Sequence, residues 1–369
     1  MITLADIEAA RERIAGAVYQ TPCAYSQTLS DLTRTECFVK LENLQMTGSF
    51  KERGAANLLR QLGAAESARG VVTASAGNHG LAVAFHGANF DEAYARAREI
   101  SDGGGGVFVH PFNDLRVIAG QATLGLELVE QQPDLDAVVV AVGGGGLAAG
   151  IALGVKAHRP GARVIGVEAA ALPAMVRALE AGQPVSLPAA PTIADGIAVR
   201  QVGDLTLDLV RKHVDEVVTV SEEELANAIL LLLEIEKTVV EGAGAAPLAA
   251  LVNRPLGLTG ARVVLVLSGG NIDVTMLSRI IERGLVKDGR LVRVGVVLRD
   301  RPGALSRLTA LIAEDRANIV QIDHHRAFSA TAIGDSEVEL TLETSGREQI
   351  DRLLTRLVSA GYHVEERQR

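Results

Sequence analysis

The stretch Val138-Val139-Val140-Ala141-Val142-Gly143-Gly144-Gly145-Gly146-Leu147 decides the fold of this chain. Its first five residues are all apolar, which is typical of a parallel strand that is buried on both faces. Similar runs occupy residues 164–167 and 263–267, and alanine- and leucine-rich helical segments alternate with such runs from about residue 70 to residue 285. This alternation predicts an α/β architecture with a parallel sheet.

The glycine loop at residues 143–146 connects this strand to the next helix. A loop without side chains exposes several backbone N–H groups at a helix N-terminus, where they can bind a phosphate. Gly143, Gly145 and Ala148 also fit the G-x-G-x-x-A pattern of dinucleotide-binding folds, with Glu168 in the place of the ribose-binding acid. An NAD(P)-dependent enzyme is therefore an alternative at this point.

A second segment, Gly48-Ser49-Phe50-Lys51-Glu52-Arg53-Gly54, places a lysine beside an aromatic ring and small residues. Desolvated lysine amines are nucleophiles that form Schiff bases with carbonyl compounds. Phe50 would then stack on a flat cofactor. The alternative is an ordinary helix N-terminus, with Ser49 as its N-cap and the following charges in solvent.

Two further loops follow predicted strands. Ser75-Ala76-Gly77-Asn78-His79-Gly80 precedes a helix, so its backbone amides are suited to a carboxylate, and Asn78 is suited to a cofactor oxygen. Ser268-Gly269-Gly270-Asn271 ends the last strand of the α/β region, where Ser268 can offer a hydroxyl to a ring nitrogen. Each loop is also compatible with a simple turn that uses Asn or Ser as a cap.

Composition excludes several classes of function. The formal net charge is -9 and the basic residues are scattered, which argues against a nucleic-acid partner. Cys23 and Cys37 lack CxxC spacing, so we expect reduced thiols in the cytoplasm and neither a disulfide framework nor a zinc site. The longest apolar stretches are too short to span a membrane, and the first seventeen residues are typical of an amphipathic helix rather than a signal peptide.

The character of the sequence changes after Gly284. Strand-like and helical segments then follow in the order βαββαβ over roughly eighty residues, which predicts a ferredoxin-like regulatory module with a boundary near residue 288. The expected segments are residues 291–298, 304–314, 318–325, 337–343, 347–360 and a short strand near residue 363.

Together these segments resemble the pyridoxal-phosphate-dependent threonine dehydratases (threonine ammonia-lyases) of the tryptophan-synthase-β-like class, with a C-terminal ACT domain. The resemblance covers nearly the whole chain, and it implies pyridoxal phosphate fold type II with two open parallel-sheet subdomains. A dinucleotide enzyme needs neither the first nor the last motif, so the resemblance disfavours NAD(P). The motifs are Lys40-Leu41-Glu42, Gly48 to Lys51, Ser75 to His79, Gly143 to Leu147, Thr192-Ile193-Ala194-Asp195-Gly196, Glu241-Gly242-Ala243-Gly244-Ala245 and Ser268 to Asn271.

The resemblance implies a role for each matching position. Lys51 holds pyridoxal 5'-phosphate as a Schiff base and later acts as the catalytic base, and Phe50 packs against it. Ser268 faces the pyridine nitrogen, and Asn78 bonds the phenolic oxygen. The remaining cofactor and substrate contacts are Gly143, Gly144, Gly145, Gly146 and Leu147 for the phosphate, and Ser75, Ala76, Gly77, Asn78 and His79 for the substrate carboxylate.

The implied reaction is the β-elimination of L-threonine to 2-oxobutanoate and ammonia, as in isoleucine biosynthesis. L-serine would give pyruvate by the same route. Serine racemase is a related alternative, but similar racemases carry a second serine at the position of Ala76 here. No metal site is assigned, because only Glu168 matches a metal ligand of some relatives and no second acidic ligand can be named.

The C-terminal module carries the loop Asp300-Arg301-Pro302-Gly303-Ala304-Leu305, which resembles the first strand-to-helix loop of ACT domains. The resemblance implies an effector site for isoleucine or valine formed by Asp300, Pro302, Gly303, Ala304 and Leu305, joined by Asn318. It also implies a homodimer or homotetramer. The alternative is a module that only dimerises.

One departure from the family pattern lies near residues 87–90, between a helix that ends near His86 and the helix expected at 91–100. Related dehydratases have a further strand, helix and strand there, roughly 35 residues. The predicted domains are therefore a catalytic domain at residues 1–287, with a small subdomain at about 40–115 shortened near 87–90, and an ACT domain at 288–369. A catalytically degenerate amino-acid sensor is the alternative that this gap raises, although Lys51, Asn78 and Ser268 are present.

Overall fold

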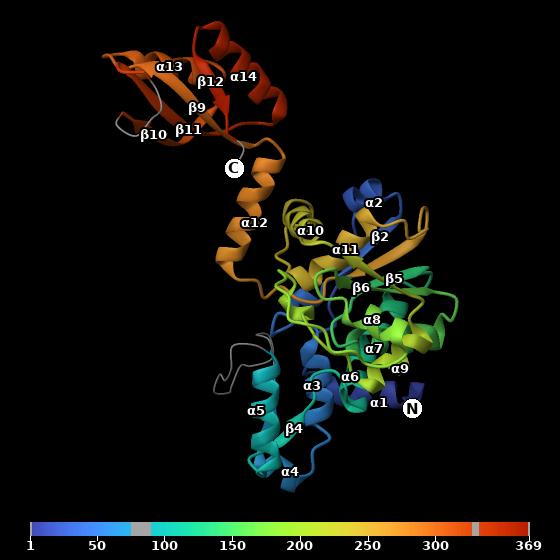
Figure 1. Cartoon of the computed structure of the whole chain (residues 1–369). Coiled ribbons are helices and arrows are strands. Elements are labelled where there is room, and N and C mark those ends of the chain that lie inside the picture. Colours follow the sequence, from blue (N-terminus) through green and yellow to red (C-terminus); the bar gives the residue numbers. More distant parts are fainter. Residues whose placement is uncertain (1, 75–89, 327–331, 368–369) are drawn as a thin grey trace. The chain divides into compact units, whose positions relative to one another are not determined.

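The computed structural model describes residues 2–74, 90–326 and 332–367 of the chain (Figure 1). The chain divides into two compact units, Met1–Asp273 and Val274–Arg369. Helix α12 (Val274–Lys287) therefore belongs to the second unit, whereas the expected boundary lay after it, near residue 288. Within the described ranges, no helix combines the length and the apolar character needed to cross a membrane.

The first unit is built on a six-stranded sheet of order β1-β2-β8-β5-β6-β7. All neighbouring pairs are parallel except β1 and β2, which confirms the predicted α/β architecture with a parallel sheet. Every residue of β5 is buried, as the continuous apolar run requires. The strands are β1 (Cys23–Tyr25), β2 (Glu36–Lys40), β5 (Ala137–Ala141), β6 (Arg163–Ala169), β7 (Glu216–Val220) and β8 (Arg262–Val266).

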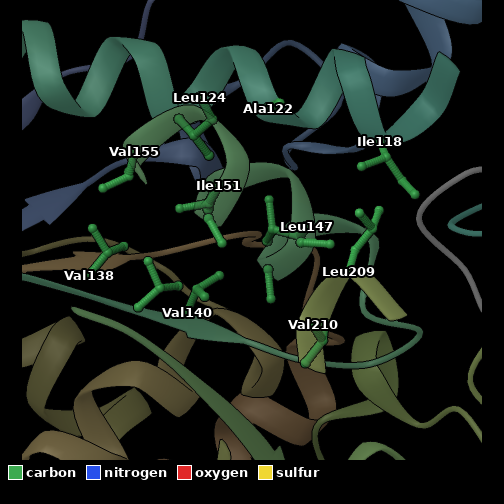
Figure 2. Close-up of a cluster of buried hydrophobic side chains, with 14 of the residues drawn as sticks. Ile118, Ala122, Leu124, Val138, Val140, Leu147, Ile151, Val155, Leu209 and Val210 are labelled. Atoms are coloured by element: carbon green, nitrogen blue, oxygen red, sulfur yellow. The ribbon is translucent and has the colours of Figure 1, made fainter. Parts of the chain in front are cut away.

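Helices pack against this sheet, and the hydrophobic core lies between them and the strands. Figure 2 shows Ile118 and Leu124 of α6 (Leu115–Gln131) beside Leu147, Ile151 and Val155 of α7 (Gly146–His158), above Val138 and Val140 of β5. Glycines let the two helices approach closely, since a Cβ on Gly154 would lie 2.4 Å from the carbonyl oxygen of Ala122. The other helices and 3-10 turns around the large sheet are α1 (Leu4–Ile14), α2 (Gln27–Thr33), η1 (Glu42–Leu44), α8 (Ala174–Ala181), η2 (Asp195–Ile197), α9 (Asp204–His213), α10 (Glu222–Ile235) and α11 (Gly242–Asn253).

A second, smaller sheet lies in the same unit. Its described strands are β3 (Val71–Thr73) and β4 (Val107–Val109), which run parallel and are connected through α5 (Phe90–Asp102). Tyr94 of α5 packs edge-on against Phe108 of β4, with 5.3 Å between the ring centroids. Helices α3 (Lys51–Leu59) and α4 (Ala64–Arg69) precede β3.

The second unit has the predicted βαββαβ order after α12. Its antiparallel sheet of order β10-β11-β9-β12 packs apolar side chains such as Val294, Val296 and Leu340 against Leu308 and Leu353 of the two helices. The elements are β9 (Leu291–Arg299), α13 (Ala304–Glu314), β10 (Asn318–His325), β11 (Asp335–Glu343), α14 (Arg347–Ser359) and β12 (His363–Glu366).

Candidate active site

A cavity lies beside the end of β5, where the glycine loop begins. The cavity is partly open to solvent, and small-ligand sites are usually concave regions of this kind, lined by apolar residues and a few polar groups. The residues that line it come from eight separated stretches of the first unit. They include Phe50, Lys51, Ala74, Phe112, Gln121, Gly143 to Leu147, Asp195 to Val199, Glu241, Ala243 and Ser268.

The lysine segment is joined to the Ser268 segment by backbone contacts. The amide of Phe50 donates a 3.0 Å hydrogen bond to the carbonyl oxygen of Ser268, and Ser49 forms an isolated β-bridge with Gly269. Ser49 is buried, and Phe50 rather than Ser49 occupies the N-cap position of α3, without a side-chain cap. The alternative of an ordinary helix N-terminus expected Ser49 as the N-cap. That expectation is wrong, because Ser49 pairs with a neighbouring segment.

Burial dominates the electrostatics of Lys51. It lowers the pKa of the Lys51 amine, while the nearby carboxylates of Glu241 and, more weakly, Asp195 oppose that change. A lowered pKa leaves a larger fraction of the amine neutral and nucleophilic near neutral pH. Lys51 therefore has the environment that Schiff-base chemistry needs.

The glycine loop forms a cradle with no room for side chains. A Cβ on Gly144 would lie 2.2 Å from Cγ of Phe112, and one on Gly143 would lie 2.9 Å from Cα of Ile197. Gly145 has a φ of 90° and caps α7, whose first-turn N–H groups lack partners within the helix. These features suit a phosphate group, since such N–H groups bind anions.

The structure brings some predicted site residues together. Phe50, Lys51, the four glycines, Leu147 and the buried Ser268 all line the cavity. Ser75, Ala76, Gly77, Asn78 and His79 lie outside the described residues, although Ala74, which precedes them, reaches the cavity wall. The roles of the individual residues remain predictions.

The cavity residues without a role assigned from the sequence include Asp195, Glu241, Gln121 and Phe112. Asp195 and Glu241 belong to motifs that the resemblance had marked, so a signal was present. Gln121 and Phe112 carried no such signal. Gln121 is 1% exposed, and its Oε1 has no hydrogen-bond partner among the described residues.

Glu168 forms hydrogen bonds away from the cavity. Its buried carboxylate accepts hydrogen bonds from the amides of Met175 (2.8 Å) and Val176 (2.9 Å) at the start of α8, and it does not line the cavity. Burial raises its pKa to about 7. In the part of the chain that the structure describes, no three His, Cys, Asp or Glu side chains form a group that could hold a metal ion.

The predicted effector loop lies in the second unit. Gly303 has a φ of 84° and caps α13, and Asp300 accepts a hydrogen bond from Arg326. Asn318 donates to Glu343 on the neighbouring strand at 3.2 Å. A separate cavity of the second unit is lined by Ala304 and by the basic side chains of Arg299, Arg301 and Arg307, among others. The effector role of this loop remains a prediction.

Comparison with known proteins identifies the family. The model of the family described as "Pyridoxal-phosphate dependent enzyme" matches residues 14–91 and 85–269. The chain is 45% identical to an L-threonine ammonia-lyase of Thermotoga maritima, with 99% of each chain covered, and 44% identical to one of Geobacter sulfurreducens, with 97% of this chain and 98% of the relative covered. The crystal structure of a threonine deaminase from the organism abbreviated T.th., 38% identical, covers 74% of this chain and 99% of its own, with a TM-score of 0.64.

Two features of these matches concern the length of the chain and the region near residue 90. The alignment with the Thermotoga maritima relative spans 398 positions, which is 29 more than the 369 residues of this chain. The two family segments overlap at residues 85–91.

The family match also decides between the two cofactors that the sequence had left open. It supports pyridoxal phosphate and not a dinucleotide. The chain therefore belongs to the family of pyridoxal-phosphate-dependent enzymes.

Proposed function

We propose that this chain is a threonine ammonia-lyase that converts L-threonine to 2-oxobutanoate and ammonia. The observation that carries the proposal is one cavity that holds a half-buried lysine, a glycine loop without side chains and the Ser268 hydroxyl. The names of the relatives that match almost the full length of the chain support the same reaction. L-serine is a second proposed substrate.

When bound, pyridoxal phosphate supplies an electron sink that stabilises negative charge at the substrate Cα. The residues of this chain hold and orient the reactants. The amides of the loop at 143–146 and of Leu147 would bind the phosphate, Phe50 would pack against the ring, and Ser268 would face the ring nitrogen. The lowered pKa of Lys51 suits it to take the Cα proton as a general base once its nitrogen is free. Asn78 and the segment 75–79 are assigned the phenolic oxygen and the substrate carboxylate.

Ser268 distinguishes this site from one with an acidic group at the ring nitrogen. A hydroxyl does not require a protonated ring nitrogen, whereas a carboxylate would favour one. A cofactor held in this way would be a weaker electron sink, which would suit prompt loss of the β-hydroxyl. The proposed specificity for elimination is consistent with this choice of residue.

We infer that the catalytic domain is residues 1–287 and that its small subdomain, residues 40–115, is shortened near 87–90. The 29 surplus alignment positions and the break in the family match at 85–91 support this inference. The described part of the small sheet has two strands. A shortened subdomain would leave cofactor binding intact and weaken its closure over the substrate, so a degenerate sensor is the second candidate function.

We propose that residues 288–369 form an ACT domain that binds isoleucine or valine and slows the enzyme. The four-stranded antiparallel sheet and its two helices support the module. A homodimer or homotetramer is proposed with it. We also propose a cytoplasmic location, which is supported by two free cysteines whose thiol pKa values burial raises, to about 11 for Cys23 and about 12 for Cys37.

The test is 2-oxobutanoate formation from L-threonine by the purified chain supplied with pyridoxal phosphate. Release by the unmodified chain and none by Lys51→Ala would support the lyase. No release by a chain that still binds the cofactor would contradict it. In that case, an unchanged response to isoleucine in Lys51→Ala would favour the sensor.

A further inference from the structure

Two carboxylates in the cavity wall have no role in the proposed function. They are Asp195 and Glu241, which belong to two motifs of the sequence that are far apart along the chain. Lys51 is the amine in the same wall. An amino acid that enters the cavity brings a second amine, and at neutral pH this amine is an ammonium group.

Glu241 is enclosed by backbone. It is 3% exposed, and its Oε1 would lie 2.4 Å from a Cβ on Gly269 and 3.0 Å from a Cβ on Gly196. The carboxylate therefore fits only because both neighbours are glycines. Its confinement between these two residues makes it part of the rigid wall rather than a group that meets an incoming ligand.

Asp195 differs because it is an exposed residue of the same wall. It begins the 3-10 turn η2, and the amide of Ala198 donates to its carbonyl oxygen at 3.1 Å. The backbone of Asp195 is thus fixed by a short turn, and this exposed residue lines the same cavity as Lys51.

The loop that carries Asp195 is held in place from both sides. The amide of Ile193 donates a 2.7 Å hydrogen bond to Glu222, and the amide of Ala194 donates to Oγ1 of Thr192 at 3.1 Å. A Cβ on Gly242 would lie 2.5 Å from the carbonyl oxygen of Ile193, so the loop rests directly on the start of α11. Asp195 is therefore presented by a fixed scaffold, as a ligand-binding group should be.

The chemistry of the proposed reaction needs such a group. An ammonium nitrogen has no free electron pair and cannot attack a carbon atom until it loses a proton. In the proposed function, the nitrogen of Lys51 would be bonded to the cofactor when the substrate arrives, so it could not take this proton. We propose that Asp195 binds the ammonium group of the amino-acid substrate at the mouth of the cavity and accepts its proton.

In this step one N–H bond of the substrate breaks and one O–H bond forms on the Asp195 carboxylate. The electron pair stays on the substrate nitrogen, and the carboxylic acid later returns the proton to water. Partial burial of the carboxyl group raises the pKa of Asp195, opposed by the amide of Gly196 and by Lys51, which makes the carboxylate a better proton acceptor. The charged groups that act on this site are Lys51 of α3 and Glu241 at the start of α11.

The inference rests on the proposed function, and it is tested without turnover. The chain loaded with pyridoxal phosphate is mixed rapidly with L-2-aminobutyrate, which has the amine of threonine but no β-hydroxyl, and the absorbance change of the cofactor is timed between pH 6.5 and 10. The variants are Asp195→Asn and Asp195→Glu. Asp204→Asn is the matched control, since Asp204 is an exposed aspartate that lines a neighbouring cavity instead.

We expect Asp195→Asn to slow the absorbance change at least about tenfold at pH 7. The difference should shrink as the pH rises through the pKa of the ligand's ammonium group, because the amine then arrives neutral. Asp195→Glu should retain most of the rate, and Asp204→Asn should match the unmodified chain.

Equal rates for Asp195→Asn and the unmodified chain at all pH values would overturn the inference. A slowing that stays the same at high pH would also overturn it, because it would indicate a structural role. If the unmodified chain binds the cofactor but shows no change with any amino acid, the proposed function fails and the inference fails with it.

Discussion

The amide of Phe50 and the carbonyl oxygen of Ser268 are joined by a 3.0 Å hydrogen bond. This bond and the one from the Gly270 amide to the Gly48 carbonyl oxygen, at 2.9 Å, connect the segment that carries Lys51 to the segment that carries Ser268. The two segments proposed to contact the cofactor are therefore joined to each other directly. The spacing between Lys51 and Ser268 depends on backbone contacts rather than on flexible side chains.

Replacing Gly48 should break this connection. Gly48 has a φ of 75°, and a Cβ there would lie 2.3 Å from Oδ1 of Asn271. Gly48→Ala should lower the free energy of unfolding by about 1 to 3 kcal/mol and abolish 2-oxobutanoate formation. Gly16→Ala is the control, since Gly16 has a φ of 74° but open space around it. This variant should lower the free energy of unfolding by about 1 kcal/mol and still form 2-oxobutanoate. Equal effects of both changes in urea unfolding would contradict the prediction.

The glycine cradle should tolerate no side chain. Gly144→Ala places a methyl group against the ring of Phe112, which must shift into or away from the cavity. We expect the affinity for pyridoxal phosphate to fall at least about tenfold, or about 1.4 kcal/mol. Titration of the cofactor absorbance measures this effect. Gly161→Ala, at a surface position with no atom within 4 Å of the added Cβ, should bind the cofactor as the unmodified chain does.

Arg53 should be essential for stability, since it is fully buried and paired with two carboxylates. Its Nε donates to Glu42 at 2.7 Å and its Nη1 to Glu127 at 2.6 Å, and Lys40 donates to Glu127 at 2.7 Å. Removing one member leaves buried charges without partners, so Arg53→Met should cost about 3 to 5 kcal/mol in chemical unfolding. The control, Arg11→Met, breaks an exposed ion pair with Glu130 and should cost less than about 1 kcal/mol. A loss below about 1 kcal/mol for Arg53→Met would refute the prediction.

Glu168 should make stability depend on pH. Its pKa is raised from 4.5 to about 7 by burial, so the folded chain binds more protons than the unfolded chain between these values. Stability should therefore fall as the pH rises through this window, by about 3 kcal/mol in total, and level off above it. Glu168→Gln cannot ionise and should lack this part of the slope in unfolding curves measured at pH 5, 6, 7 and 8. An equally steep slope in the variant would rule out Glu168 as its source.

The effector loop should be required for feedback. If isoleucine binds beside Gly303, a side chain at this left-handed position should distort the start of α13. Gly303→Val should raise the half-inhibiting isoleucine concentration at least about tenfold, while uninhibited turnover stays the same. Gly334→Val is the control, since Gly334 also has a positive φ, of 95°, but lies outside the predicted effector loop. Unchanged inhibition in Gly303→Val would exclude the loop as the effector site.

Much of the site could be predicted because its signals are local. A continuous apolar run indicates a strand that is buried on both faces. Four consecutive glycines indicate a backbone that approaches a ligand or another segment closely. The lysine in Gly48 to Lys51 and the serine after β8 are likewise marked by their immediate neighbours. The resemblance then assigned roles that these patterns alone had left open between two cofactors.

Other features depend on partners far away in the chain. Nothing near Arg53 indicates that Glu127, 74 residues later, completes its ion pairs. Glu168 fitted a ribose-binding acid by spacing, but the start of α8 takes both of its oxygens. The unit boundary after Asp273 depends on the contacts that α12 makes in the folded chain. The composition of that segment does not predict these contacts.

The sequence by itself determined the α/β class, the βαββαβ order of the second unit and the segments that meet at the cavity, because each is encoded in periodicity, glycine placement and short motifs. Only the tertiary structure decided which side chains complete the cavity wall. Asp195 and Glu241 line the same cavity as Lys51, because strand order and close glycine contacts bring three distant loops together. Burial and the charges of those neighbours, which no local pattern records, then set the pKa of the lysine.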